Sequence, residues 1–234
     1  MRRVGYSLVD LLYPPHCYLC GKSLATHRYI CQSCLSSFDQ ITNPVCERCG
    51  KPALESGGVC SECAKGDREF FLARSYGLYR PGNGLAEAIS GFKYEGEKAL
   101  SNDLAPLLTR GKPGELVDAV EAITFVPLNE EKLKERGFNQ AELLARKVSR
   151  ITGIPIFRTL SKPVLTKPQA KLSREERLTN VSGSFDPEKT IHRDRVLLID
   201  DVFTTGSTAD ECSRVLKEAG AEQVYVTTLA RTIV

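Results

Sequence analysis

Two adjacent acids and a run of small polar residues near the end of the chain are the groups best suited to chemistry. Asp200 and Asp201 follow an apolar run at positions 196–199. Five small or hydroxyl-bearing residues come shortly after them: Thr204, Thr205, Gly206, Ser207 and Thr208. Consecutive backbone N–H groups at the start of a helix bind phosphate, and glycine lets the main chain approach closely. Paired carboxylates accept hydrogen bonds from vicinal hydroxyls or hold hydrated Mg²⁺. The pattern predicts a site for a phosphorylated ligand that carries hydroxyl groups.

A buried strand, a turn and a helix must hold these residues. The run at 196–199 is apolar at consecutive positions, which suits a strand covered on both faces of a parallel sheet. Ligands of such sheets bind at the carboxyl ends of the strands. After the turn, one helix face is apolar: Ala209, Cys212, Val215, Leu216 and Ala219. We therefore interpret Cys212 as a core residue and not as a nucleophile.

Two other interpretations of this stretch are less favoured. An apolar strand ending in acids also occurs as the Walker B strand of nucleotide triphosphatases. Its partner is missing, because His16 stands where a P-loop ending in Gly21-Lys22-Ser23 would need a glycine. A strand, turn and helix that bind nothing would not need five small polar residues in succession.

Eight of the nine cysteines form four C-x-x-C pairs within residues 17–63: Cys17/Cys20, Cys31/Cys34, Cys46/Cys49 and Cys60/Cys63. Two thiolates at this spacing can bind one metal ion from a single tight turn. Because all eight would fill two closed Cys₄ sites, the predicted Zn²⁺ ions are structural and not catalytic. Disulfides are disfavoured because the rest of the chain is typical of a cytosolic protein, where thiols stay reduced.

The cysteine segment is an internal repeat. The sequence Cys17-Tyr18-Leu19-Cys20-Gly21-Lys22 returns 29 positions later as Cys46-Glu47-Arg48-Cys49-Gly50-Lys51, and Cys31/Cys34 returns as Cys60/Cys63. A repeated unit with four ligands favours sequential pairing, in which each unit closes its own site. A crossed arrangement, with Cys17/Cys20 and Cys46/Cys49 at one metal, stays open.

Length and composition limit the remaining possibilities. The 234 residues suffice for one α/β domain and a small appendage. We place the N-terminal helix, expected over residues 4–12, and the double zinc ribbon in residues 1–66, and the α/β domain in 67–234. The net charge of +3 is too small to indicate nucleic-acid binding. Asp10 interrupts the apolar start of the chain, and no segment approaches the roughly 18 apolar residues of a membrane span. We expect a cytoplasmic protein without membrane insertion.

Further elements of the α/β domain can be read from periodicity. Strands are predicted over 70–79, 122–128 and 224–229, and helices over 85–94, 98–108 and 141–151. Lys93, in the last turn of its helix, is interpreted as complementing the helix dipole, with a ligand role as the alternative. Residues 129–136 are read as a charged turn at the same sheet edge as Asp200. Lys132, Lys134 and Arg136 in it could neutralise a pyrophosphate, although a solvated loop would look the same.

Residues 158–180 have no clear strand pattern and are rich in cations. A connection of this length in a compact domain is usually functional or disordered. Ser173-Arg174-Glu175-Glu176 begins as a capping box does, so a short helix is expected within it. Lys171 and Arg174 belong to this segment, which could close over the site as a lid and exclude water.

The stretch from Val196 to Thr208 resembles the phosphoribosyl pyrophosphate (PRPP) motif of type I phosphoribosyltransferases. The resemblance implies that Asp200 and Asp201 contact the ribose hydroxyls and that Thr204 to Thr208 bind the 5-phosphate. The whole chain resembles the ComF (ComFC) family, in which a double zinc ribbon is fused to a phosphoribosyltransferase-type domain. The segments that carry this resemblance, beside the cysteine repeat, are Phe92-Lys93-Tyr94, Val126-Pro127-Leu128, Glu135-Arg136-Gly137-Phe138-Asn139-Gln140, Gln169, Leu172-Ser173-Arg174-Glu175-Glu176-Arg177 and Asn180.

This resemblance implies a fold and a function. The fold is α/β, a type I phosphoribosyltransferase-like doubly wound and mostly parallel sheet behind a small double zinc ribbon. The function is binding of PRPP with Mg²⁺, in a cytoplasmic protein of natural transformation whose partners are single-stranded DNA and a ComFA-like helicase. If the domain is catalytic, ribose 5-phosphate passes to a nucleophile as pyrophosphate leaves, with Lys132 or Arg136 at the pyrophosphate and Lys171 and Arg174 in the lid.

Two other functions stay open. One is a PRPP-sensing or DNA-binding module without turnover, and the other is nucleobase salvage. The acceptor substrate and the oligomeric state have no signal in the sequence.

Overall fold

The computed structural model describes residues 15–24, 28–55, 57–66, 68–162, 185–188 and 190–233. Its main sheet has four parallel strands in the order β1-β6-β5-β2. Their bounds are β1 Leu72–Leu78, β2 Ala122–Phe125, β5 Arg195–Phe203 and β6 Gln223–Arg231. The segment at Ile156 adds a short parallel bridge to Ile123 at the β2 edge. Leu160–Ser161 (β3) and Asp186–Pro187 (β4) form a separate antiparallel pair.

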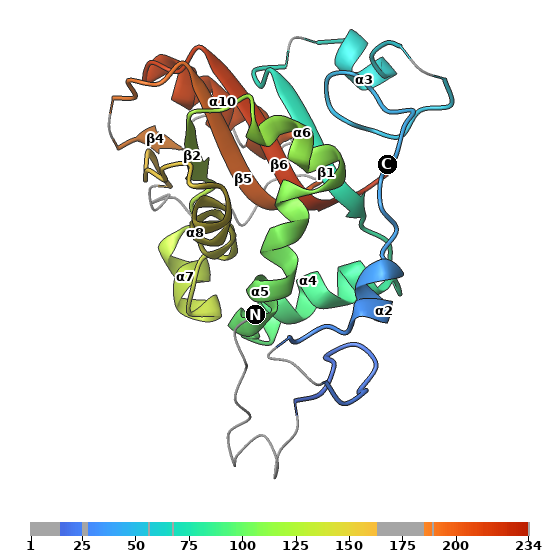
Figure 1. Ribbon diagram of the computed structural model, residues 1–234. Coiled ribbons are helices and arrows are strands. Elements are labelled where there is room, and N and C mark those ends of the chain that lie inside the picture. Colours follow the sequence, from blue (N-terminus) through green and yellow to red (C-terminus); the bar gives the residue numbers. More distant parts are fainter. Residues whose placement is uncertain are drawn as a thin grey trace, which may run out of the picture.

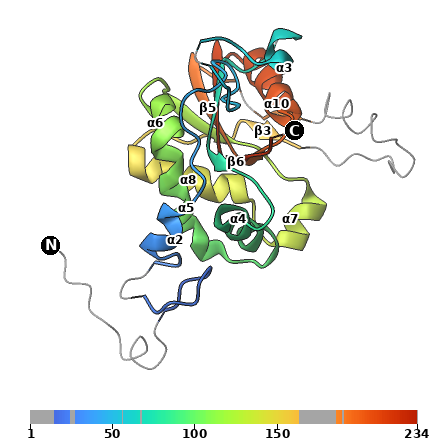
Figure 2. The same cartoon turned by 90° about the vertical axis from the view of Figure 1, so that its right-hand side faces the viewer.

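Helices cover both faces of the sheet, as Figure 2 shows with the sheet between α8 and α10. Between β1 and residue 152 the chain forms, in addition to β2, the helical segments α4 Gly84–Tyr94, η1 Lys98–Leu100, α5 Ser101–Leu104, η2 Ala105–Thr109, α6 Gly111–Val117, α7 Glu130–Arg136 and α8 Gln140–Thr152. Of these, α8 packs on one face of the sheet, against β2 and β5. The opposite face carries α10, Ser207–Glu218. The central strand β5 is buried on both faces at Val196 to Ile199, which is what its unbroken apolar run predicts. Cys212 is completely buried on α10, as predicted for a core residue.

The two ribbons lie at opposite ends of the molecule (Figures 1 and 2). The first, with α2 Gln32–Ser36, lies beside α4, where the Tyr18 hydroxyl donates to Glu95 Oε2 at 2.9 Å. The second, with α3 Ser61–Ala64, lies along β1, where the Ala73 N–H donates to the Arg48 carbonyl at 2.8 Å. Cysteines of both ribbons belong to the same buried cluster as the sheet. The predicted fold class, a parallel α/β sheet with a double zinc ribbon, is confirmed.

Two sequence-based predictions were wrong in detail. Residues 130–136 form the helix α7 and not a turn, because the Asn129 side chain caps it by accepting the Lys132 N–H at 3.0 Å, and Gly137 ends it at φ +71°. Leu160 and Ser161 form a strand where none was expected. The predicted N-terminal helix over residues 4–12 lies outside the described residues, as do residues 163–184.

Within the part of the chain that the structure describes, no helix is both long enough and apolar enough to cross a bilayer.

Candidate functional site

Each ribbon brings four cysteine sulfurs together, with all ligand atoms of a set within 4.8 Å of one another. The sets are Cys17, Cys20, Cys31 and Cys34, and Cys46, Cys49, Cys60 and Cys63. The pairing is therefore sequential, and the crossed arrangement is excluded. The Cys20–Cys31 and Cys49–Cys60 sulfur distances are both 3.7 Å. A tetrahedral zinc with Zn–S bonds of 2.3 Å separates its sulfurs by about 3.8 Å. Both sets thus fit Zn²⁺.

The repeat explains why both sites have the same shape. The N–H of the glycine after the second cysteine donates to the first cysteine's carbonyl, at 2.8 Å for Gly21 and 2.9 Å for Gly50. These glycines have φ of +68° and +69°, a left-handed conformation that side chains disfavour. In the second site, burial alone would raise the pKa of Cys46, but backbone amides that donate to its sulfur lower that pKa to about 6. A thiolate ligand is favoured for this reason.

The acid pair and the hydroxyl residues meet at the carboxyl end of β5. Asp200 and Asp201 are partly buried, and Thr204 and Thr205 are exposed. Gly206 is the N-cap of α10 at φ +88°, without a side chain of its own to cap the helix. The first N–H groups of α10 are therefore directed at the space beside the loop, which is favourable for an anion. The Thr205 and Ser207 hydroxyls lie 2.9 Å apart above them.

Lys93 is the side chain that contacts this acid pair. Its Nζ lies 2.7 Å from Asp201 Oδ1, and the two side chains are only 15% and 13% exposed. The sequence interpretation of Lys93 as a partner of the helix dipole missed this ion pair. A signal was present, because Lys93 lies in one of the segments that carry the family resemblance.

The site has unbalanced negative charge at Asp200. Burial and the neighbouring Asp201 charge raise its pKa to about 7, although Lys93 and the Asp201 N–H, which donates to Asp200 Oδ1 at 2.8 Å, act in the opposite direction. Lys162 adds a second nearby positive charge, and burial together with Lys132 lowers its own pKa. A divalent cation would offset the repulsion between the two carboxylates, and carboxylate oxygens are usual ligands for Mg²⁺.

The other positively charged side chains predicted for the site differ in their exposure and contacts. Lys132 is exposed on α7, whereas Arg136 stacks on Tyr94 with its guanidinium 5.0 Å from the ring centre. Arg136 also donates to Gln140 Oε1 at 3.3 Å, and Gln140 is 1% exposed beneath the end of α4. Gln140 Nε2 in turn donates to the Lys93 carbonyl at 3.4 Å, which joins α8 to the end of α4. Lys171 and Arg174 lie outside the described residues.

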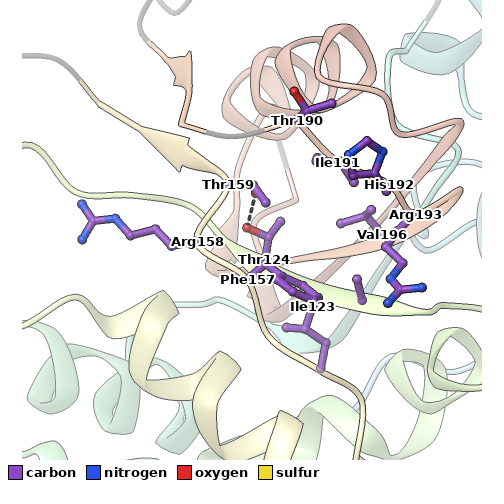
Figure 3. Close-up of a pocket in the computed structure, with 11 residues that line it drawn as sticks. Ile123, Thr124, Phe157, Arg158, Thr159, Thr190, Ile191, His192, Arg193 and Val196 are labelled. Carbon is purple, nitrogen blue, oxygen red and sulfur yellow. Dashed lines mark hydrogen bonds between the residues drawn. The ribbon is translucent and has the colours of Figure 1, made fainter.

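An apolar cavity of about 330 Å³ lies away from the acid pair (Figure 3). It is at the amino ends of β2 and β5, between Phe157 and Ile191, and Thr124 and Thr159 share a 2.7 Å hydrogen bond in its wall. Since Asp200 is at the other end of β5, this cavity is separate from the acid pair.

Comparisons with known proteins agree with the cysteine sites and identify relatives over most of the chain. A double zinc ribbon domain model matches residues 8–64. Competence protein F of Haemophilus influenzae is 33% identical over 210 residues, which cover 86% of this chain and 88% of that protein. DNA utilization protein YhgH of Salmonella typhimurium is 29% identical over 229 residues, 95% of this chain and 100% of that protein. Purine phosphoribosyltransferase from Pyrococcus horikoshii has a TM-score of 0.33 and 17% identity over 67% of this chain and 90% of its own, a similarity too low to carry an argument. The family resemblance inferred from the motifs is confirmed, and the chain belongs to the competence protein F family.

Proposed function

We propose that this chain binds Mg²⁺-PRPP at the carboxyl end of β5 and acts in DNA uptake or DNA utilization. The observation that carries the proposal is the pairing of two acids with a glycine-capped helix start, Asp200 and Asp201 beside residues 204–208. The names of the relatives support the DNA role, since one is a competence protein and the other a DNA utilization protein. Single-stranded DNA and a ComFA-like helicase stay predicted partners. The cytoplasmic location also stays a prediction.

Different residues of the site are proposed to bind differently charged parts of the ligand. The N–H groups and hydroxyls of residues 204–208 bind the 5-phosphate, because they are donors at the positive end of a helix dipole. Asp200 and Asp201 accept hydrogen bonds from the ribose hydroxyls, and Lys93 fixes the Asp201 carboxylate. Mg²⁺, when bound with PRPP, supplies charge neutralisation for the diphosphate. Lys132 and Arg136 are proposed to act on the same diphosphate, and Lys171 and Arg174 in closure over it.

Calorimetric titration of Mg²⁺-PRPP into the zinc-loaded protein tests the binding site. We expect the Asp200→Asn/Asp201→Asn variant to bind at least about 100-fold more weakly, because two charge-assisted hydrogen bonds are worth roughly 3–6 kcal/mol together. The matched control is Asp118→Asn/Asp194→Asn, which changes the same charge at two exposed positions and should bind as the wild type does. Equal binding by both double variants contradicts the assignment.

Turnover and the DNA role need separate measurements. Release of pyrophosphate in the presence of a free nucleobase would indicate salvage, and binding without release would indicate a sensing module. For the DNA role, we expect the wild type, but not Asp200→Asn/Asp201→Asn, to restore DNA utilization to a Salmonella strain that lacks its YhgH protein. Equal restoration by both proteins would separate the DNA role from the PRPP site.

A further inference from the structure

The second ribbon packs against the start of β1 and also contacts Arg231 at the end of β6, which pairs with Phe203 directly before the residue 204–208 loop. Figure 1 shows α3 and its loops near the carboxyl end of the chain, next to β1. Arg74 on β1 donates to the Glu47 carbonyl at 3.1 Å, and Arg48 donates to the Phe70 carbonyl at 3.2 Å. The zinc ligands of this ribbon are thereby fixed relative to the strands.

Arg231 links a zinc ligand to the strand that carries the acid pair. It is the last residue of β6 and is 3% exposed. Its Nη1 donates to the Cys49 carbonyl at 2.6 Å and to Cys49 Sγ at 3.7 Å. The same guanidinium lies 5.0 Å from the ring centre of Phe203, the last residue of β5. One buried cation therefore contacts both the ribbon and the residue directly before the loop.

Arg68 makes a second link, from the ribbon to α10. Its Nη1 lies 2.5 Å from Asp210 Oδ2 in the first turn of that helix. Asp210 also accepts the Glu69 N–H at 3.0 Å. On the ribbon side, Arg48 donates to the Arg68 carbonyl at 2.5 Å. Arg68 thus connects the second ribbon, through Arg48, to the helix whose N–H groups face the loop.

The two links meet beneath Gly206. A Cβ atom at this position would lie 2.7 Å from Phe203 Cζ and 3.1 Å from Arg68 Nη1. The left-handed turn at Gly206 therefore packs against Arg68 and against Phe203, the ring that Arg231 contacts. Because packed side chains respond to shifts of a few tenths of an ångström, displacement of either arginine must displace this turn.

We propose that the second zinc ribbon positions the phosphate loop, with Arg231 and Arg68 as the positioning residues. A Zn²⁺ with four thiolates has a net charge of about −2, and this charge holds both guanidinium groups in the arrangement that orders residues 203–210. The ligand of the loop rests on the proposed function, whereas the link between ribbon and loop does not. Because coupling between two sites is reciprocal, a ligand at the loop must also tighten the equilibrium binding of zinc by the second ribbon.

Variants of the two arginines test the link without removing a zinc ligand. We expect Arg231→Met and Arg68→Met to weaken Mg²⁺-PRPP binding roughly tenfold and to speed amide hydrogen exchange in residues 203–210. Arg68→Lys, which keeps the charge opposite Asp210, should recover part of the affinity. The control is Arg28→Met beside the first ribbon, where Arg28 donates to Gln32 Oε1, and it should change neither quantity.

Equilibrium competition for zinc with a colorimetric chelator supplies the reciprocal measurement. The two sites can be separated with Cys20→Ser/Cys34→Ser and Cys60→Ser/Cys63→Ser, each of which retains one ribbon. We expect Mg²⁺-PRPP to raise the zinc affinity of the second ribbon several-fold and to leave that of the first unchanged. Equal protection of both ribbons, or loop exchange that is unchanged when the second zinc or either arginine is lost, overturns the proposal. If the wild type does not bind Mg²⁺-PRPP, the proposed function fails, and loop exchange alone then decides whether the ribbon orders the loop.

Discussion

Asp200 is a carboxyl group whose ionisation opposes folding. Its pKa is raised from its ordinary value to about 7, chiefly by burial and then by the Asp201 charge. The folded protein therefore binds more protons than the unfolded chain between pH 4 and pH 7, so the contribution of Asp200 to stability is greatest below about pH 4 and is lost as the pH rises to about 7. For one proton, the slope is at most about 1.4 kcal/mol per pH unit.

Asp200→Asn should remove this dependence. We expect the variant to gain stability relative to the wild type as the pH rises, reaching about 1–3 kcal/mol at pH 7.5. Urea unfolding at pH 4.5, 6 and 7.5 measures the difference. Asp118→Asn, at an exposed position, is the control and should run parallel to the wild type. A constant difference between Asp200→Asn and the wild type over this pH range would show that Asp200 ionises normally.

Lys93 should contribute to stability through its ion pair with Asp201. Both side chains are mostly buried, so Lys93→Met leaves an uncompensated carboxylate and also removes a charge that lowers the Asp200 pKa. A double-mutant cycle with Asp201→Asn should give a coupling of about 1–3 kcal/mol in urea unfolding at pH 7.5. The exposed pair Lys134 and Glu130, 3.9 Å apart, should give less than about 0.5 kcal/mol. Similar couplings in the two cycles would mean that burial adds nothing to the Lys93 pair.

For single residues, the sequence predicted which side chains belong to the site but not which side chains contact one another. Asp200 and Asp201 could be identified because strand and loop chemistry are local in sequence. The contact of Lys93 with Asp201 joins positions 108 residues apart, and periodicity contains no information on that pairing. Arg68 and Arg231 were missed for the same reason, because each acts across elements.

Among the elements, the turn from β5 into α10 depends on the absence of a side chain at Gly206. Gly206→Ala would bring a Cβ to 2.7 Å from the Phe203 ring in addition to the strain of φ +88°. Gly82 has a similar φ of +79°, but the space around it is open. We expect Gly82→Ala to lower the unfolding free energy by about 1 kcal/mol, and Gly206→Ala by at least 2–3 kcal/mol with a loss of ligand binding at the loop. Equal losses of unfolding free energy in the two variants would contradict the close packing around Gly206.

The type of an element could be predicted from the sequence pattern where a single physical requirement dominated. The unbroken apolar run of β5 and the repeated C-x-x-C units left few alternatives, because burial on both faces and metal binding are strict requirements. The helix α7 was misread because charge alone does not separate a turn from a helix. Its acidic first turn, basic last turn and caps at Asn129 and Gly137 were the signals that would have identified it.

For the whole molecule, the ribbons pack into the α/β unit from both ends. A Cβ at Gly91 on α4 would overlap the Tyr18 hydroxyl of the first ribbon, and Arg74 on β1, 9% exposed, donates to backbone carbonyls of the second. The cysteines share one buried cluster with the sheet. The boundary at residue 66 that the sequence suggests stays a prediction, but the contacts across it are those of a continuous core.

Zinc removal should therefore destabilise the sheet as well as the ribbons. Because a structural zinc contributes folding free energy directly, we expect chelation to lower the melting temperature and to speed amide exchange throughout β1 and β6, whose ends contact the second ribbon. Restoring zinc should reverse both changes. A chain of residues 67–234 should behave as the chelated protein does, because the buried Arg74 loses the Cys46 and Glu47 carbonyls that it contacts. Unchanged exchange in β1 and β6 after zinc loss would instead show that the sheet folds independently, and the shared core would then be a contact surface between two autonomous units.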